Sequence, residues 1–261
     1  MRPAARSNIA SSFTMLKGAL IEESYSYLAD WDPSRTKEEN IRHWKDRNPV
    51  GLRTATWLRD VAFVMSRRFD PAGRDQPLRE LAKNHCELQE WKPILLWHIT
   101  RDEFVLRDFL ENWLYGAYEA GVFRVRAEDL YAHLRSLPSR GGVLFKAWSE
   151  TTVDRVAHAL LVMARDFGFL RGSVVKEFAS YHLPERSFLY LLHAMRDQNL
   201  SSGKLVGAPD WRMFLMRPAD VEHELLRLHQ FRKLEYQVAG SIVELRLPYP
   251  TSRQYAERMI A

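Results

Sequence analysis

Two stretches of the sequence combine hydroxyl side chains with cations near a predicted helix start, and phosphate binding is the chemistry that this pattern favours. The first stretch runs from Lys146 to Arg155 and contains Ser149, Thr151 and Thr152. Hydroxyls and free backbone N–H groups at a helix N-terminus contact phosphate oxygens, and Arg adds a two-pronged contact. The same residues would also suit an ordinary N-cap followed by solvated charges. The sequence leaves both interpretations open.

The second stretch is the helix predicted over residues 52–69. Its first two turns and its last turn carry the candidate DNA contacts Arg53, Thr54, Thr56, Arg59, Arg67 and Arg68. Small hydroxyls and arginines at a helix start fit a phosphate track or a DNA groove. The alternative is a bundle helix with a basic outer edge and an apolar inner face, to which we assign Val61, Phe63 and Met65.

A third group of candidates belongs to a predicted β-hairpin. Arg171 and Lys176 flank its turn, which follows the helix predicted over residues 153–167. The order helix, helix, hairpin is typical of a winged helix, a helix-turn-helix relative in which the hairpin forms the wing. Winged helices bind DNA, and they also serve as protein-docking modules.

No strong catalytic motif accompanies these basic segments. The phosphate-binding loop, the dinucleotide fingerprint, the nucleophile elbow and the H-E-x-x-H zinc motif are all missing from the sequence. The nine His are scattered, and the single Cys, Cys86, excludes an internal disulfide or a multi-thiolate zinc site and is expected to be buried. We therefore expect no enzyme activity, no metal and no cofactor. A metal-dependent nuclease is the least favoured alternative.

The predicted elements indicate a mainly α protein with small β-hairpins. Helices are expected over residues 7–29, 37–46, 52–69, 77–87, 94–99 and 104–120. After Gly121 we expect a β-like piece at 122–125, helices at 127–136 and 153–167, a hairpin at 169–181, helices at 186–198 and 219–231, a second hairpin at 236–247 that turns at Gly240-Ser241, and a closing helix at 251–259. This predicts an N-terminal helical bundle over residues 1–120 and a winged-helix-like α+β part over 121–261.

Composition is consistent with a globular, cytoplasmic protein. Of the 261 residues, 46% are hydrophobic and 27% are charged, and the net charge is +5. No apolar run reaches the roughly 18 residues that a membrane span needs, and no secretory signal is visible. The 38 basic residues comprise 9 Lys and 29 Arg. An Arg excess permits a nucleic-acid partner, but a GC-rich genome would also produce it.

The ordered set of motifs resembles the BrxA family of BREX phage-defence systems over residues 8–259. The set comprises T-M-L-K-G-A-L-I-E-E-S from Thr14, the Asn48-Pro49 turn, M-S-R-R-F from Met65, L-R-D-F-L from Leu106, W-S-E-T-T from Trp148, A-R-D-F-G-F-L from Ala164 and A-P-D-W-R-M-F from Ala208. The resemblance implies a NusB-like helical N-terminal part and a non-enzymatic, DNA-binding accessory protein. From the family we carry over only the Arg-rich helix positions Arg53, Arg59, Arg67 and Arg68, and the helix start from Ser149 to Arg155.

We therefore expect a double-stranded DNA-binding protein that contacts mainly phosphates, with other BREX proteins, such as the methyltransferase or the ATPase, as possible partners. Two alternatives remain. One is a protein-docking adaptor within the BREX complex, and the other is a generic winged-helix transcriptional regulator. The sequence predicts neither the oligomeric state nor the DNA site.

Overall fold

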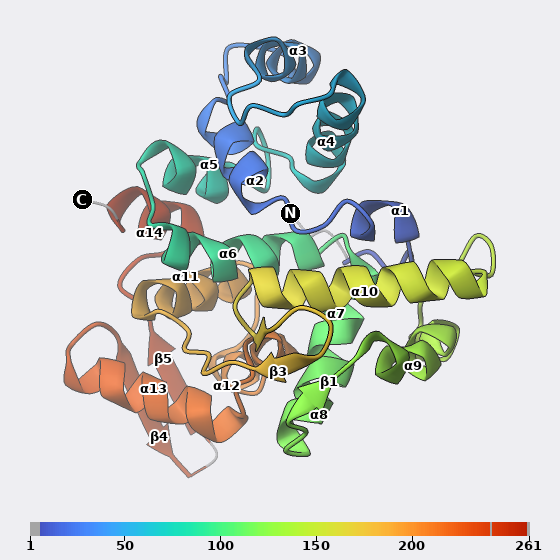
Figure 1. The fold of residues 1–261 in the computed structure, drawn as a ribbon. Helices are drawn as coiled ribbons and strands as arrows, with labels where there is room; N and C mark the ends of the chain where they lie inside the picture. The colour runs from blue at the N-terminus through green and yellow to red at the C-terminus, as the bar shows by residue number, and fades with distance from the viewer. Residues whose placement is uncertain (1–5, 241, 260–261) are drawn as a thin grey trace.

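The computed structural model describes residues 6–240 and 242–259, and it is mainly helical with two small antiparallel sheets (Figure 1). The prediction of a mainly α protein with small β-hairpins is confirmed. The elements up to Gly121 are α1 (Ser12–Met15), α2 (Ile21–Ala29), α3 (Lys37–Arg47), α4 (Ala55–Arg68), α5 (Gln76–Lys83), α6 (Leu88–Thr100), α7 (Phe104–Asp108), the π-helical η1 (Phe109–Leu114) and α8 (Tyr115–Glu119).

The prediction of a single helix over residues 7–29 is wrong. Two short helices, α1 and α2, take its place. Gly18 and Leu20 between them have positive φ angles of 83° and 53°. A left-handed residue cannot continue a right-handed helix, so the chain turns there. Before α1, Ile9 pairs instead with Val143 in a parallel β-bridge.

Local capping fixes the starts of α3 and α4. Thr36 accepts a hydrogen bond from the backbone N–H of Glu39, and the Glu39 carboxylate accepts one in return from the backbone of Thr36. Thr54 caps α4 by accepting from the N–H of Trp57 at 3.2 Å. Such caps satisfy backbone donors that the first turn leaves free. The helices predicted over residues 37–46 and 52–69 are therefore present, with small shifts at their ends.

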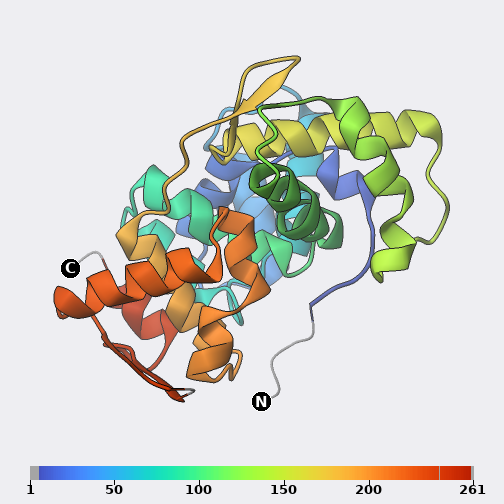
Figure 2. The ribbon, with the colours of Figure 1, turned by 90° about the horizontal axis from the view of Figure 1, so that it is seen from below.

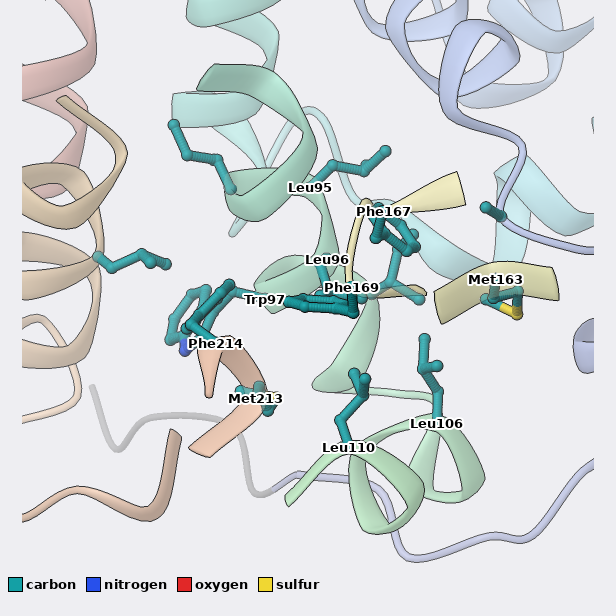
Figure 3. Close-up of a cluster of buried hydrophobic side chains, with 14 of the residues drawn as sticks. Leu95, Leu96, Trp97, Leu106, Leu110, Met163, Phe167, Phe169, Met213 and Phe214 are labelled. Carbon is teal, nitrogen blue, oxygen red and sulfur yellow. The ribbon is translucent and has the colours of Figure 1, made fainter. Parts of the chain in front are cut away.

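The central helix α6 joins the two halves of the chain in one core. Figure 3 shows Leu96 and Trp97 of α6 surrounded by side chains from three other parts of the chain. Leu106 and Leu110 come from α7 and η1, and Phe167 and Phe169 flank Gly168 in the second half of the chain. All of these residues belong to the same buried cluster. The boundary between residues 120 and 121 stays a prediction.

The segment after Gly121 forms one long helix and a small three-stranded sheet. Its elements are β1 (Arg124–Val125), η2 (Ala127–Leu130), α9 (Tyr131–Arg135), η3 (Leu137–Arg140), α10 (Glu150–Asp166), β2 (Leu170–Arg171) and β3 (Lys176–Phe178). The antiparallel sheet order is β1-β3-β2, with Arg124 opposite Glu177 and Leu170 opposite Phe178. The turn between β2 and β3 stands out from the helices (Figure 2), and Val174 in this turn is 83% exposed.

The remaining elements are α11 (Glu185–Arg196), α12 (Ser202–Val206), η4 (Pro209–Phe214), α13 (Pro218–Gln230), β4 (Glu235–Ala239), β5 (Ile242–Arg246) and α14 (Ser252–Arg258). Strands β4 and β5 form the second predicted hairpin, from the Glu235–Arg246 pair to the Ala239–Ile242 pair. Of its predicted turn, Ser241 lies outside the described residues. The closing helix is also present, as α14.

Candidate nucleic-acid interface

The outer face of α4 carries most of the candidates from the second stretch. Thr56, Arg59, Phe63 and Arg67 are all exposed, and their spacing of three or four residues places them on one side of the helix. Arg53 is also exposed, just before α4. Our assignment of Phe63 to the core is wrong, since this side chain is 49% exposed. Phe63 lies at the same spacing as the polar residues of this face, so the helical period already contained that signal.

Helix α10 also presents a continuous outer face. Thr151, Arg155, His158 and Arg165 are exposed along it, while its opposite face packs into the core. Ser149 caps the helix and accepts a hydrogen bond from the N–H of Thr152 at 3.3 Å. The carboxylate of Glu150 in the first turn is paired with Arg135 at 2.5 Å, so its charge is compensated. The predicted N-cap is confirmed, and a hydroxyl in that role can still face a ligand.

A hollow of about 500 Å³ lies where the end of α4, helix α1 and the start of α10 meet. Figure 1 shows α1 between the other two helices. The predicted residues that line the hollow are Arg67 from the second stretch and Lys146, Ser149 and Thr152 from the first. Phe13, Phe145 and Trp148 also line it. Among its lining residues, all within the described part of the chain, none carries a carboxylate.

Contacts distant in sequence hold the rim of this hollow in place. The bridge to the N-terminal segment consists of two hydrogen bonds of 2.8 Å, from Ala10 N–H to the carbonyl of Val143 and from Val143 N–H to that of Asn8. On the α4 side, the Phe13 ring meets Phe63 edge-on at 5.7 Å between centroids. These contacts fix the loop that carries Phe145 and Lys146 beside α1.

Arg68 does not belong to this surface, although it is the neighbour of Arg67. Its side chain is 1% exposed and pairs with Glu103 at 3.4 Å. It also donates to the backbone carbonyls of Thr14, Gly18 and Ala19. Burial lowers the pKa of the guanidinium, and the Glu103 carboxylate opposes that shift. Arg68 therefore fixes the turn between α1 and α2 and cannot reach a ligand, so we withdraw it from the candidate contacts.

Lys176 is also buried and cannot contact DNA. It is 3% exposed, and its ammonium donates to the carbonyl of Ser173 at 2.6 Å, inside the hairpin turn. Burial lowers the pKa of this ammonium. Arg171 is exposed but shares the carboxylate of Glu177 with Arg124, at 3.3 and 3.1 Å. The hairpin therefore offers less free positive charge than the sequence suggested.

The predicted cations fall into two groups along the surface. Arg67 and Lys146 meet at the hollow, and Arg155 follows on the outer face of α10. Arg53 precedes the other end of α4, roughly 20 Å from Arg67 at 1.5 Å per helical residue. Within residues 6–240 and 242–259, Arg53, Arg67, Lys146 and Arg155 form no ion pair, whereas Arg59 lies 3.8 Å from Asp60.

The exposed aromatic rings are the residues that the sequence reasoning missed. Phe145 is 85% exposed and Phe13 is 41% exposed, although both types are usually buried. Phe13 lies in the short helix α1, which the break at Gly18 separates from α2. Phe145 lies in a loop with no periodic pattern, so no sequence signal could place it.

The other chemistry-bearing groups are structural or isolated. The described residues contain no group of three His, Cys, Asp or Glu side chains placed to hold a metal ion. Cys86 is buried, as predicted, and burial raises the pKa of its thiol to about 12. His98 bonds Asp75 and Tyr190 at 2.7 Å each, but all three side chains are buried in the core. None of the helices in the described ranges is long and apolar enough to cross a membrane.

Comparison with known proteins identifies the family. A family model described as BrxA matches residues 11–194, well over half of the chain. The matched region includes α1, α4 and the start of α10, so it contains every residue that lines the hollow except Ile9 and Ala10. No curated protein matches the chain. The chain therefore belongs to the BrxA family, which associates it with BREX phage defence.

Proposed function

We propose that this protein is a non-catalytic, double-stranded DNA-binding accessory protein of a BREX system and that it contacts mainly the phosphate backbone. The observation that carries this proposal is the meeting of Arg67 and Lys146, from segments far apart in sequence, at a hollow lined by no carboxylate. Exposed cations without an acidic partner attract a polyanion and release its counterions on binding. Arg155 extends the same charge along α10.

The topology around α10 supports a winged-helix mode of binding. Helix α8, strand β1, helices α9 and α10, and the hairpin β2-β3 follow one another, and the sheet order β1-β3-β2 is typical of a winged helix. In that arrangement α10 would be the recognition helix. Its exposed Thr151 and Arg155 would face a groove, and the β2-β3 turn would lie along the backbone.

Charge removal at matched sites tests the proposal. The test variant is Arg67→Ala, Lys146→Ala and Arg155→Ala. The control, with the same charge change, is Arg196→Ala, Arg232→Ala and Lys233→Ala, which removes three exposed cations that form no ion pair within the described residues. Affinity for a mixed-sequence duplex is measured by fluorescence anisotropy over a range of salt concentrations. The test variant should bind more weakly, with a salt slope reduced by about 0.9 for each lost phosphate contact. Equal slopes for the two variants would refute the assignment.

Absence of catalysis is part of the proposal and needs its own experiment. Supercoiled plasmid incubated with the protein and Mg²⁺ or Mn²⁺ should stay intact, because the described residues offer no cluster of metal ligands. Nicked or linear plasmid that appears only with the metal would establish a nuclease instead.

A protein-docking adaptor is the second candidate function, and exposed apolar side chains at the end of α13 and on the hairpin β4-β5 favour it. Phe231, Val238 and Ile242 are 63%, 53% and 70% exposed. Exposed apolar groups of this kind often mark protein interfaces. Purified BREX methyltransferase and ATPase should be retained on the immobilised protein without DNA if docking is direct. Retention that disappears after nuclease treatment would assign the contact to DNA.

A further inference from the structure

The aromatic rings at the hollow are not explained by a grip on phosphates. Phosphate contacts need cations, hydroxyls and backbone N–H groups, and the hollow supplies these in Arg67, Lys146 and Ser149. Phe145 nevertheless stands 85% exposed at the same site, with Phe13 at 41% and a half-buried Trp148 beside it. Three aromatic rings in one open hollow offer a stacking surface to a ligand with an apolar, flat part.

The composition of the hollow favours a nucleotide over a peptide. A nucleotide combines a flat base, which stacks on aromatic rings, with a phosphate, which pairs with Arg or Lys. Both partners are present here, and the lining contains no carboxylate that would bind a peptide cation. The volume of about 500 Å³ falls within the range of roughly 300–1,000 Å³ that small-ligand sites occupy.

A paired base in a continuous duplex cannot reach these rings. Its faces are covered by the neighbouring bases, and only its edges are accessible in the grooves. A base enters an aromatic site only when it is unpaired or turned out of the stack, which costs least where it has no partner. The hollow therefore fits an unpaired nucleotide, which a duplex presents at a bulge or at an end.

We infer that the hollow captures one unpaired nucleotide, with the base stacked on Phe145 and its phosphate held by Lys146 and Arg67. This inference rests on the proposed DNA-binding function, and it adds a preference that a grip on phosphates alone would not have. The protein binds duplex DNA through α10 and α4, and it binds more tightly where the duplex presents a bulged or single-stranded nucleotide next to that contact.

The test compares a fully paired duplex with the same duplex containing a single-nucleotide bulge. Affinities are measured by fluorescence anisotropy at one salt concentration for the wild type, Phe145→Ala and Phe145→Trp. The wild type should prefer the bulged duplex by about tenfold, the ratio that one base–aromatic stack supplies. Phe145→Ala should lose this preference and keep its affinity for the paired duplex, while Phe145→Trp should retain both. Phe231→Ala removes a comparably exposed ring elsewhere and serves as the matched control.

The outcomes separate this inference from the function on which it rests. Equal binding of paired and bulged duplex by the wild type refutes the inference and leaves the proposed function intact. No binding to either duplex refutes both. If Phe145→Ala weakens binding to both duplexes equally, the ring is a general contact and base capture is wrong. If Phe145→Ala leaves the preference intact and instead abolishes retention of a BREX protein, the hollow is a peptide site.

Discussion

The hollow and the buried polar cluster around Arg68 both contain arginine, which has a different role in each. Arg67 lines the hollow, and its neighbour Arg68 is buried against Glu103. Both lie near the segment that carries α1, since Arg67 lines the hollow together with Phe13 and Arg68 donates to the carbonyl of Thr14. Within the described residues, Arg67 and Lys146 at the hollow form no ion pair, whereas the buried Arg68 is paired with Glu103.

This difference shows that pairing and burial, rather than residue type, decide what an arginine does. A buried cation is tolerated only when carboxylates and carbonyls replace its water, so it becomes part of the fold. An exposed cation with no ion pair adds little to stability and keeps its charge for a ligand. Variants of the two regions should therefore separate folding from binding.

The largest effect is expected for Arg68→Ala. Removing this side chain leaves Glu103 buried and unpaired, and such a loss costs about 3–5 kcal/mol of folding free energy. The matched control is Arg67→Ala, which should change stability by no more than about 0.5 kcal/mol because the side chain is exposed. Urea unfolding followed by circular dichroism measures both. Equal midpoints for the two variants would contradict a structural role for Arg68.

A pH dependence from the interior should come next in size. Burial, with the nearby charge of Arg101, lowers the pKa of His98 to about 4 from 6.5, so the folded state keeps this ring neutral. Between these pH values the unfolded chain binds more protons, and stability should therefore fall as the pH falls from 6.5 towards 4. His98→Gln should remove up to about 1.4 kcal/mol per pH unit from that slope. Urea unfolding at several pH values between 4 and 6.5 measures this slope. An unchanged slope in the variant would show that groups other than His98 cause the pH dependence of stability.

The cap of α10 should give a smaller loss. Ser149→Ala removes the acceptor of the Thr152 N–H and should cost about 1 kcal/mol of stability. Thr151→Ala, two residues further on, removes an exposed hydroxyl that caps nothing and should leave stability unchanged. Thermal unfolding of the two variants compares them directly. If Thr151→Ala destabilises the protein more than Ser149→Ala does, Ser149 is not the capping residue of α10.

The smallest effect is expected for Arg53→Ala combined with Arg59→Ala. These side chains lie towards the start of α4, away from the hollow, and Arg59 is near Asp60. Their loss should weaken DNA binding less than loss of Arg67 and Lys146, and flatten the salt slope by about 0.9 for each phosphate contact that they make. Anisotropy titrations over a range of salt concentrations measure this. A larger effect than that of Arg67 and Lys146 would move the interface to the other end of α4.

Much of the fold could be predicted because its signals are local. Ser149 was expected to open a helix, and it caps α10. Thr54, expected inside the helix over residues 52–69, instead caps the start of α4. The hairpins after residues 169 and 236 followed from apolar runs broken by glycine, and both are present. The exception is the helix expected over residues 7–29. There the left-handed conformation of Leu20, an unusual one for this residue type, is imposed by packing.

The candidate site could be predicted only in part, as the case of Arg67 and Arg68 shows. Adjacent helical residues point about 100° apart, so one can face water while the next faces the core. The helical period predicted that the outward positions of α4 share a face. It did not show that Arg68 pairs in the core with Glu103, which is 35 positions away in the sequence.

The sequence by itself determined the helical class, the capped start of α10, the two hairpins and the resemblance to the BrxA family. These features depend on residues a few positions apart, whose interactions form wherever the chain lies. Only the tertiary structure decided which cations stay free, that Lys176 is buried, and that Phe13, Arg67 and Phe145 surround one hollow. Those outcomes depend on contacts between segments far apart in the chain, such as the bridge from Ile9 to Val143, and no local pattern encodes them.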